Sequence, residues 1–307
     1  MTSRKHPQGV FAAIVTPLNA DFSLDFDTIQ PLFSFLFQRG CHGGLLFGTT
    51  GEGPSFAPDE RMAFMHRAIQ ARQTIPDFQL LAGTGTPSLE ETIALTRTAF
   101  DLGFNGVVVL PPYYYKKIEE EGLFLWFSQV IQKAVPSDGS FFAYHIPAIS
   151  GITMSHDLLA RLKDTFPNQF AGIKDSTGDV ENSRLLGERF GDDLVVFTGN
   201  DKLMSEALSN HASGCITAMA NICSTDLRTI WDAHQNRISK NDVQYRLNAL
   251  RKVMDQYPPA PGFIKTMLAN RFGFPRWNVR PPLLPLPEPV FREALTEWDA
   301  IDHVGCE

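Results

Sequence analysis

Short apolar runs recur along the chain, and each ends at glycine, proline, threonine, serine or asparagine. Their apolar character is largely continuous instead of alternating with polar residues, which is typical of parallel strands buried on both faces. Eight such runs are present: GVFAAIVTP from Gly9, GGLLFGTTG from Gly43, FQLLAGTG from Phe78, NGVVVLPP from Asn105, SFFAYHIP from Ser140, FAGIKDS from Phe170, LVVFTGN from Leu194 and SGCITAMAN from Ser213. The pattern therefore predicts eight buried parallel strands.

The stretches between these runs have the periodicity of amphipathic helices. Residues 25–40 place their apolar side chains on one helical face, at Ile29, Leu32, Phe33, Leu36 and Phe37. Three further segments begin with proline or serine in a capping position: PDERMAFMHRAIQA, SLEETIALTRTAFDLG and SHDLLARLKDTF. Several segments end at glycine, as at Gly40 and Gly103, which is the usual end of a helix. Helices are therefore predicted between the strands.

The alternation of strand and helix predicts the overall architecture. Units of roughly 30 residues have the length of a βα unit, and eight of them favour a closed (β/α)₈ TIM barrel. The alternative is a doubly wound open sheet, which often carries a glycine-rich phosphate turn after its first strand. That turn is VTPLNAD in this chain, without GxGxxG, and the glycines of GTTGEG at 48–53 have a different spacing. The barrel is therefore the predicted fold.

The chain continues well beyond the eighth run. We expect residues 1–222 to form the barrel core through strand eight, and residues 223–307 to form the last barrel helix and a C-terminal helical extension. Helical patterns in this extension are NDVQYRLNALRKVMDQ, GFIKTMLANRFG and PVFREALTEWDAID. The proline-dense segment RPPLLPLPEP from Arg280 predicts an extended connector. No second catalytic domain is expected.

Composition narrows the class of protein. Of 307 residues, 43% are hydrophobic, and 27 Lys and Arg against 34 Asp and Glu give a net charge of -7. Because no basic block stands out, we expect no nucleic-acid partner. No stretch approaches the roughly 20 apolar residues needed to span a bilayer, and MTSRKHPQGV lacks the apolar core of a signal peptide. These features predict a cytoplasmic protein without a membrane partner.

The cysteines and the other potential metal ligands predict no bound metal. The four cysteines, Cys41, Cys215, Cys223 and Cys306, form no CxxC pair. We therefore expect reduced thiols packed as small apolar side chains. No set of His, Asp, Glu and Cys residues has the spacing of a metal site either.

Candidate functional residues follow from the barrel, because barrel active sites form at the C-terminal ends of the strands. The polar residues that close the apolar runs are therefore expected around one mouth, although they are far apart in sequence. They are Thr49, Thr50, Tyr114, Tyr144, Lys174, Ser176 and Asn200.

Lys174 is the most informative of these residues, since it ends an apolar run in FAGIKDSTGD. Partial burial disfavours the ammonium form of a lysine and makes a neutral amine available near pH 7. A neutral amine can attack a ketone to give a Schiff base, whose protonated form stabilises a carbanion on the adjacent carbon. The alternative is a lysine that extends to a neighbouring carboxylate at the barrel rim. The position on the strand alone leaves both open.

Two further features could serve the same chemistry. Tyr144, one strand earlier, could relay protons to and from a carbonyl oxygen or a hydroxyl, or be a core aromatic with one hydrogen bond. Its neighbour His145 points to the opposite face of the strand, so a structural role is favoured. The hydroxyls and N–H groups of GTTGEG suit the carboxylate of a 2-keto acid, or belong to an ordinary tight turn. Glu52 is expected to orient this turn by accepting backbone N–H groups.

PPYYYKK at 111–117 contains three consecutive tyrosines. A surface aromatic cluster often marks a subunit interface, and packing beneath the loop is the alternative. The residues alone do not distinguish the two.

Taken in order, FAAIVTPLNADFSLD, GTTGEG, PPYYYK, AYHIPAISG, GIKDSTGD and GCITAMAN resemble the dihydrodipicolinate synthase/N-acetylneuraminate lyase family of class I Schiff-base pyruvate aldolases. The resemblance covers nearly the whole chain, and the ordered set is specific although each piece alone is common. It implies a metal-independent lyase that needs no cofactor beyond a covalent Schiff base on Lys174. It also implies a homotetramer built as a dimer of dimers.

The resemblance also implies roles for individual residues. Lys174 would form the imine with pyruvate or another 2-keto acid, and Tyr144 would be the general acid/base. Thr49 would link Tyr144 to Tyr114, which in the synthases reaches into the neighbouring subunit's site. The substrate-binding set would be Thr50, which with Thr49 holds the carboxylate, Ile216 at the pyruvyl group, and Gly48, Ser176, Ile149 and Asn200.

Two departures from the family pattern bear on the substrate. The lysine-pathway synthases carry an arginine two residues after the proline of their Tyr-Asn-x-Pro stretch, where this chain has Ile149. Loss of such a charge-assisted carboxylate contact costs roughly 1.5–3 kcal/mol, which disfavours aspartate semialdehyde as the acceptor. IPAISG is more similar to the sialic acid lyases, but their Asp-Glu pair after the strand-seven glycine is Asp201-Lys202 here. The acceptor pocket therefore matches neither prototype.

The sequence predicts a Schiff-base aldolase or lyase that acts on pyruvate or a related 2-keto acid and an aldehyde. Alternatives within the family are a dehydratase or deaminase of a sugar-derived 2-keto acid, because the same imine permits β-elimination, and a 4-hydroxy-tetrahydrodipicolinate synthase. An alternative of another class is a non-catalytic keto-acid-binding protein. Lys174, Tyr144 and Thr49 together argue against it, since simple binding requires neither an imine lysine nor a proton relay.

Overall fold

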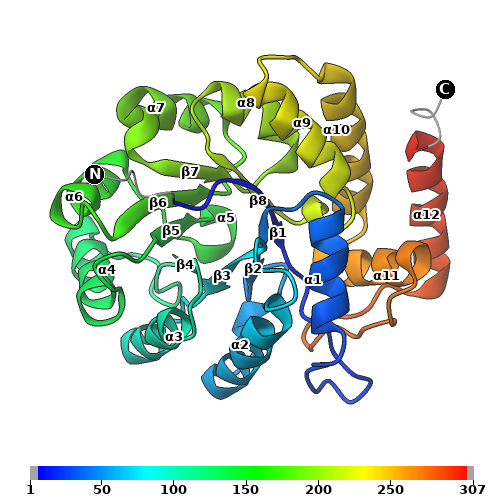
Figure 1. Cartoon of the computed structure of the whole chain (residues 1–307), viewed down its shortest axis with the longest axis horizontal. Helices are drawn as coiled ribbons and strands as arrows, with labels where there is room; N and C mark the ends of the chain where they lie inside the picture. The colour runs from blue at the N-terminus through cyan, green and yellow to red at the C-terminus, as the bar shows by residue number, and fades with distance from the viewer. Residues whose placement is uncertain (1–5, 303–307) are drawn as a thin grey trace.

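The computed structural model describes residues 6–302 of the chain, and its centre is a closed barrel (Figure 1). Eight parallel strands pair in sequence order and β8 pairs with β1. The strands are β1 (Gly9–Ala13), β2 (Gly43–Leu46), β3 (Gln79–Gly83), β4 (Gly106–Val109), β5 (Phe141–His145), β6 (Phe170–Asp175), β7 (Val195–Thr198) and β8 (Gly214–Thr217). Each lies within one of the apolar runs, so the predicted (β/α)₈ barrel is confirmed.

Helices follow the strands and surround the barrel (Figure 1). They are α1 (Ile29–Gln38), α2 (Pro58–Arg72), α3 (Leu89–Asp101), α4 (Glu120–Ala134), α5 (Pro147–Ser150), α6 (His156–Thr165), α7 (Val180–Phe190), α8 (Met204–Ser209) and α9 (Ser224–Gln235). The predicted caps are present, because the side chains of Ser88 and Ser155 accept backbone N–H groups of the first turns of α3 and α6.

One predicted core position in α1 is wrong. The stripe of Ile29, Leu32, Phe33 and Leu36 is buried, but Phe37 is 38% exposed. Phe37 lies about 90° around the helix from the centre of this stripe, so it falls at the edge of the face that meets the barrel. There its ring makes only an edge contact with Phe78.

Three helices form the C-terminal part of the described chain: α10 (Asn241–Gln256), α11 (Ala260–Phe272) and α12 (Glu288–Asp302). In Figure 1 they lie together at one side of the barrel, with α12 outermost. The proline-rich segment from Arg280 connects α11 to α12 without helix or strand. α10 packs against α9, α12 and the short 3₁₀ turn η3 (Asp201–Leu203) that follows β7. No helix within residues 6–302 is long and apolar enough to cross a membrane.

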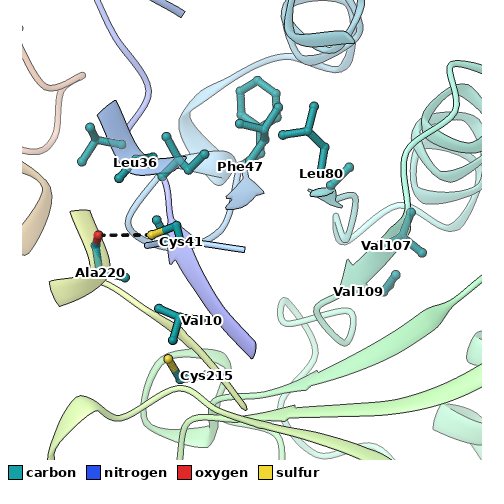
Figure 2. Packing of buried hydrophobic residues seen from close by; sticks show 14 of the residues in the cluster. Val10, Leu36, Cys41, Phe47, Leu80, Val107, Val109, Cys215 and Ala220 are labelled. Atoms are coloured by element: carbon teal, nitrogen blue, oxygen red, sulfur yellow. Dashed lines mark hydrogen bonds between the residues drawn. The ribbon is translucent and has the colours of Figure 1, made fainter. Parts of the chain in front are cut away.

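The apolar core has two layers. Inside the barrel, side chains from the strands form one cluster, in which the ring of Phe197 contacts those of Phe11 and Phe142. The larger layer lies between the strands and the surrounding helices, where Val10, Leu80, Val107 and Val109 point outward from their strands (Figure 2). The barrel interior is therefore a packed core, and only the strand ends remain for a site.

The cysteines of the described residues lie in this outer layer, as expected. Cys41, Cys215 and Cys223 are buried free thiols, and Cys306 lies outside the described residues. The Cys41 thiol donates to the carbonyl of Ala220 at 3.7 Å (Figure 2). Burial raises the pKa of Cys41 to about 12, so this thiol stays protonated and behaves as a small apolar side chain.

Candidate active site

A cavity of about 300 Å³ lies at the carboxyl ends of the strands. Its wall contains eight of the residues predicted from sequence: Thr49, Thr50, Tyr144, Ile149, Lys174, Ser176, Asn200 and Ile216. Gly48 instead lines a small adjoining cavity that shares Thr49 and Tyr144 with the first. Tyr114 lines neither cavity, and its side chain is 73% exposed. One chain therefore brings together the predicted residues except Tyr114.

Lys174 faces this cavity because β6 contains an irregularity. Phe141 of β5 pairs with Phe170, but the next residue, Phe142, pairs with Gly172, so that Ala171 is an extra residue in β6. Simple alternation from the outward-packed Phe170 would direct Lys174 toward the helices. The bulge shifts this alternation by one residue, which is how bulges re-aim side chains next to active sites.

Tyr144 is the direct neighbour of Lys174 across the sheet. The two residues are register partners in β5 and β6, and the Lys174 ammonium lies 4.0 Å from the centroid of the Tyr144 ring. Both are buried, with 3% of Lys174 and 5% of Tyr144 exposed. The hydroxyl of Tyr144 lies 3.2 Å from Oγ1 of Thr49. A buried amine and a buried phenol therefore meet at the wall of the cavity.

The surroundings of the phenol change its acidity. Burial raises the pKa of Tyr144, but the Lys174 ammonium and hydrogen bonds from Thr49, Lys174 and Ser176 together outweigh burial. The net pKa of Tyr144 is lowered from its ordinary value of 10.0. A tyrosine with a lowered pKa exchanges protons more readily near neutral pH, which suits a general acid/base.

The turn after β2, whose residues Thr49 and Thr50 line the cavity, contains backbone donors without a partner in residues 6–302. The backbone N–H groups of Thr49, Thr50 and Gly51 donate to no group of residues 6–302, and the side chains of Thr49 and Thr50 line the wall. Amide and hydroxyl donors in such a concave turn can hold an anion without a counter-charge. The arrangement can therefore bind a carboxylate next to Lys174.

Glu52 accepts a backbone N–H, as expected, but its partners lie outside the turn that it was expected to orient. It accepts no backbone N–H of its own turn; it accepts from the Lys265 ammonium of α11 at 2.5 Å and from the backbone N–H of Arg280 at 2.8 Å. The ammonium is a stronger donor than a turn amide, and both partners come from the C-terminal part. Glu52 itself has left-handed backbone, with φ of 55°. The turn is thus held from outside the barrel.

His145 and Asp175 lie on the outer face of the same two strands. The Nδ1 of His145 is 3.1 Å from a carboxylate oxygen of Asp175, and its Nε2 accepts the backbone N–H of Met154 at 3.3 Å. These partners fit a neutral ring that carries its proton on Nδ1. Since His145 is buried and not part of the cavity wall, its expected structural role agrees with its position.

The loop after β4 exposes two of its three tyrosines. Tyr114 and Tyr115 are 73% and 71% exposed and stack edge to face, with ring centroids 5.3 Å apart. Packing beneath the loop is therefore excluded for these two side chains. Only Tyr113 is partly buried.

Sequence reasoning missed one part of the wall. Arg251, Met254 and Asp255 of α10 line the cavity, together with Pro258 and Ala260 after the helix. In the sequence, an Arg and an Asp four residues apart look like an ordinary surface pair. No local signal places them at a site, because their position depends on how the extension folds back onto the barrel.

The chain is similar to known proteins over nearly its whole length. A sequence model of the dihydrodipicolinate synthetase family matches residues 6–296. An uncharacterized DapA-like lyase of Chloroflexus aurantiacus is 34% identical over 281 residues, which cover 91% of this chain and 92% of that protein.

Solved structures show the same fold. The dihydrodipicolinate synthase of Agrobacterium tumefaciens superposes with a TM-score of 0.88 at 28% identity, over 96% of this chain and 99% of the other. YagE, a prophage protein of E. coli K12 that belongs to the dihydrodipicolinic acid synthase family and was solved in complex with pyruvate, superposes with a TM-score of 0.87 at 25% identity. The superposition with YagE covers 96% of this chain and 98% of that one.

Proposed function

This chain belongs to the dihydrodipicolinate synthetase family, and on that premise we propose that it is a Schiff-base lyase acting on pyruvate or a related 2-keto acid. The observation that carries the proposal is the buried pair of Lys174 and Tyr144, with the ammonium 4.0 Å from the phenol ring. A family relative, YagE, was solved with pyruvate bound. Simple binding of a keto acid would require neither an amine nor a phenol at this place.

In the first step the neutral amine of Lys174 attacks C2 of the keto acid. The carbonyl oxygen takes one proton from the attacking amine and one from Tyr144 and leaves as water, and the protonated imine remains. The carboxylate of the keto acid would lie in the turn at Thr49 and Thr50, whose backbone N–H groups have no partner within residues 6–302. Ile216, at the end of β8, would contact the pyruvyl carbons.

The second step forms or breaks the bond between C3 and C4. In the direction of synthesis, the Tyr144 phenolate takes a proton from C3 to give the enamine, C3 attacks the aldehyde carbon, and Tyr144 passes its proton to the aldehyde oxygen. In cleavage, the Tyr144 phenolate removes that proton and the C3–C4 electron pair returns to the imine. Tyr144 then returns its proton to C3 of the enamine, and hydrolysis of the resulting imine releases the keto acid and regenerates the Lys174 amine. Thr49, 3.2 Å from the phenol oxygen, is the next member of the proton path.

We further propose that Tyr114 completes this path in the site of a neighbouring subunit. Its exposed side chain beside Tyr115 supports contact with a second copy of the chain, because exposed aromatic pairs are enriched at interfaces. A homotetramer built as a dimer of dimers would bring such loops together in pairs.

An aldol reaction is favoured over synthesis of 4-hydroxy-tetrahydrodipicolinate. Ile149 lies in the cavity wall and is 58% exposed, so it presents an apolar surface where the synthases carry an arginine. An acceptor with a carboxylate would have no charged partner there. Dehydration or deamination of a sugar-derived keto acid uses the same imine and remains the second candidate.

Borohydride reduction in the presence of pyruvate tests the imine directly. We expect one reduced pyruvyl group per chain, located on Lys174 by peptide mass mapping, since reduction converts the imine into a stable secondary amine. Lys202→Met, which removes another lysine close to the cavity, should give the same adduct. Folded protein without an adduct on Lys174 would contradict the proposed function.

Tyr144→Phe tests the proton path. We expect turnover to fall by about 10²–10⁴-fold, as when a general acid/base is removed, with borohydride trapping still possible. In cleavage the Tyr144 phenolate is the base, and the pKa of Tyr144 is lowered, so kcat/KM of the wild type for cleavage should rise with pH, with a midpoint below the ordinary value of 10.0. The variant should lack this rise. Tyr245→Phe, a surface change on α10, should alter neither quantity, and an unchanged pH profile in Tyr144→Phe would contradict the assignment.

A further inference from the structure

Part of the cavity wall comes from α10 and not from the barrel. The strand ends supply Lys174, Tyr144 and the turn at Thr50, which together account for the keto-acid part of a substrate. Besides Ser176, which follows β6, the remaining polar side chains of the wall are Arg251 and Asp255 of α10 and Asn200, which follows β7. These groups are therefore available to the part of a substrate that lies beyond its keto-acid carbons.

The charges around this part of the wall cancel. Arg251 donates through Nη1 to the carboxylate of Asp201. Its Nε donates to the carboxylate of Asp255 at 2.8 Å. Asp255 also accepts from the Lys202 ammonium, at 3.2 Å. The four side chains therefore form a chain of two cations and two anions with no net charge.

The same side chains keep unused hydrogen-bonding groups. Within the described part of the chain, Nη2 of Arg251 and Nδ2 of Asn200 donate to no protein group, and the carboxylate of Asp255 is 39% exposed. A hydroxyl group both donates and accepts, so it can satisfy an arginine N–H and a carboxylate together. A carboxylate or phosphate can only accept, and it would meet the negative charge of Asp255 without an unpaired cation in compensation.

We propose that Arg251, Asp255 and Asn200 form the subsite for the distal part of the substrate and select an uncharged, hydroxyl-bearing acceptor over one that ends in a carboxylate or phosphate. This inference rests on the proposed Schiff-base function and adds its acceptor class. Ile146 and Ile149, in the same wall, present apolar surface to the carbon chain between the hydroxyls.

The electrostatics of Arg251 are consistent with a permanently paired cation. Burial opposes its charge, but the carboxylates of Asp201 and Asp255 outweigh burial, and the pKa of Arg251 is raised above its ordinary value. Its charge is therefore shared with two anions before any substrate arrives, while its Nη2 donors stay available.

The test compares four aldehydes with pyruvate as the common donor. They are glyceraldehyde, which is neutral and hydroxylated, glyceraldehyde 3-phosphate, succinic semialdehyde and propanal. We expect kcat/KM of the wild type for glyceraldehyde to exceed that for the two charged aldehydes by about 10-fold or more. A wild type that prefers either charged aldehyde would overturn the inference.

Two variants separate the subsite from the imine chemistry. Arg251→Met should lower kcat/KM for glyceraldehyde by roughly 10- to 100-fold and lower that for propanal, which has no hydroxyl to bind, by a clearly smaller factor. Asp255→Asn frees positive charge, so it should raise kcat/KM for glyceraldehyde 3-phosphate relative to glyceraldehyde. Arg276→Met, which removes an exposed arginine paired with Glu288, should change none of these ratios.

Borohydride trapping with pyruvate alone tests the Schiff-base function separately from the acceptor subsite. If wild type and Arg251→Met both form the adduct but the aldehyde preferences above fail, the subsite is wrong and the Schiff-base function stands. If the wild type forms no adduct, the proposed function itself fails. An equal loss with all four aldehydes in Arg251→Met would assign this arginine to structure and overturn the inference.

Discussion

Lys174→Met is expected to abolish turnover and to make the protein more stable. Without the amine no imine forms, and removal of the nucleophile in covalent enzymes lowers kcat by about 10⁴-fold or more. The residue is 3% exposed. The lysines of residues 6–302 that form ion pairs are Lys133, Lys202 and Lys265, so Lys174 has no carboxylate partner there. Methionine has a similar length and no charge to desolvate.

The gain in stability has a physical basis in the environment of the amine. The ammonium of Lys174 loses most of its hydration on folding, and its contact with the Tyr144 ring replaces only part of it. Replacing a buried charge by an apolar side chain of similar volume is often stabilising, and active sites commonly hold such unfavourable groups. We expect the free energy of unfolding to rise by about 1–2 kcal/mol.

Urea unfolding and pyruvate trapping at one protein concentration measure both effects. Lys163→Met is the matched control: its ammonium donates to the carbonyls of Pro167 and Phe170, outside the cavity. That variant should lose stability and keep both the adduct and turnover. A Lys174→Met protein that unfolds at lower urea than the wild type would contradict the view that this lysine is held at the expense of stability.

The fold could be predicted from the sequence because parallel strands buried on both faces produce continuous apolar runs. FAGIKDS is an example, since β6 occupies Phe170–Asp175 within it. The positions of Thr50, Tyr144 and Lys174 at the cavity followed from the rule that the strand ends share one mouth. These predictions depended on local patterns, and the structure agrees with them.

The direction of Lys174 could not be predicted in the same way. Strict alternation from Phe170 would have pointed it outward, and the bulge at Ala171 reverses this. The bulge occurs in the pairing with β5, next to a close approach of β7: a Cβ atom at Gly172 would clash with the backbone carbonyl of Val195. A lone glycine within a strand is the only sequence signal of such a feature.

The contacts that the C-terminal extension makes with the site could not be predicted from the sequence either. Arg251 and Asp255 reach the cavity, and Lys265 reaches Glu52 across 213 residues of sequence. Helical periodicity predicts that these helices exist but not which face of the barrel they meet. Contacts of this kind require the tertiary arrangement.

The contact between Lys265 and Glu52 should have a large effect on stability. The two side chains are 1% and 0% exposed and lie 2.5 Å apart. Burial lowers the pKa of Lys265, and Glu52 offsets only part of this effect. Removing one member of such a pair leaves an uncompensated buried charge, so Lys265→Met and Glu52→Gln should each lower the free energy of unfolding by about 3–5 kcal/mol.

The double variant Glu52→Gln/Lys265→Met distinguishes a costly unpaired charge from an intrinsically strong pair. The double variant has no charged side chain at either position. The amide oxygen introduced by Glu52→Gln can still accept the backbone N–H of Arg280, as the Glu52 carboxylate does. We expect its loss in the free energy of unfolding to be much smaller than the sum of the losses in the two single variants. A loss equal to that sum would contradict this explanation. Arg276→Met, at an ion pair that is 55% and 49% exposed, should change stability by less than about 1 kcal/mol.

The same variants connect the extension to the site. Glu52 holds the end of the turn that carries Thr49 and Thr50, and both Glu52 and Phe47 have left-handed backbone, with φ of 55° and 56°. Such strained residues persist only where the surroundings hold them. In the double variant, which keeps most stability, the turn loses its ionic anchor, so KM for pyruvate should rise while the adduct still forms on Lys174. An unchanged KM would mean that the pair stabilises the fold without positioning the carboxylate turn.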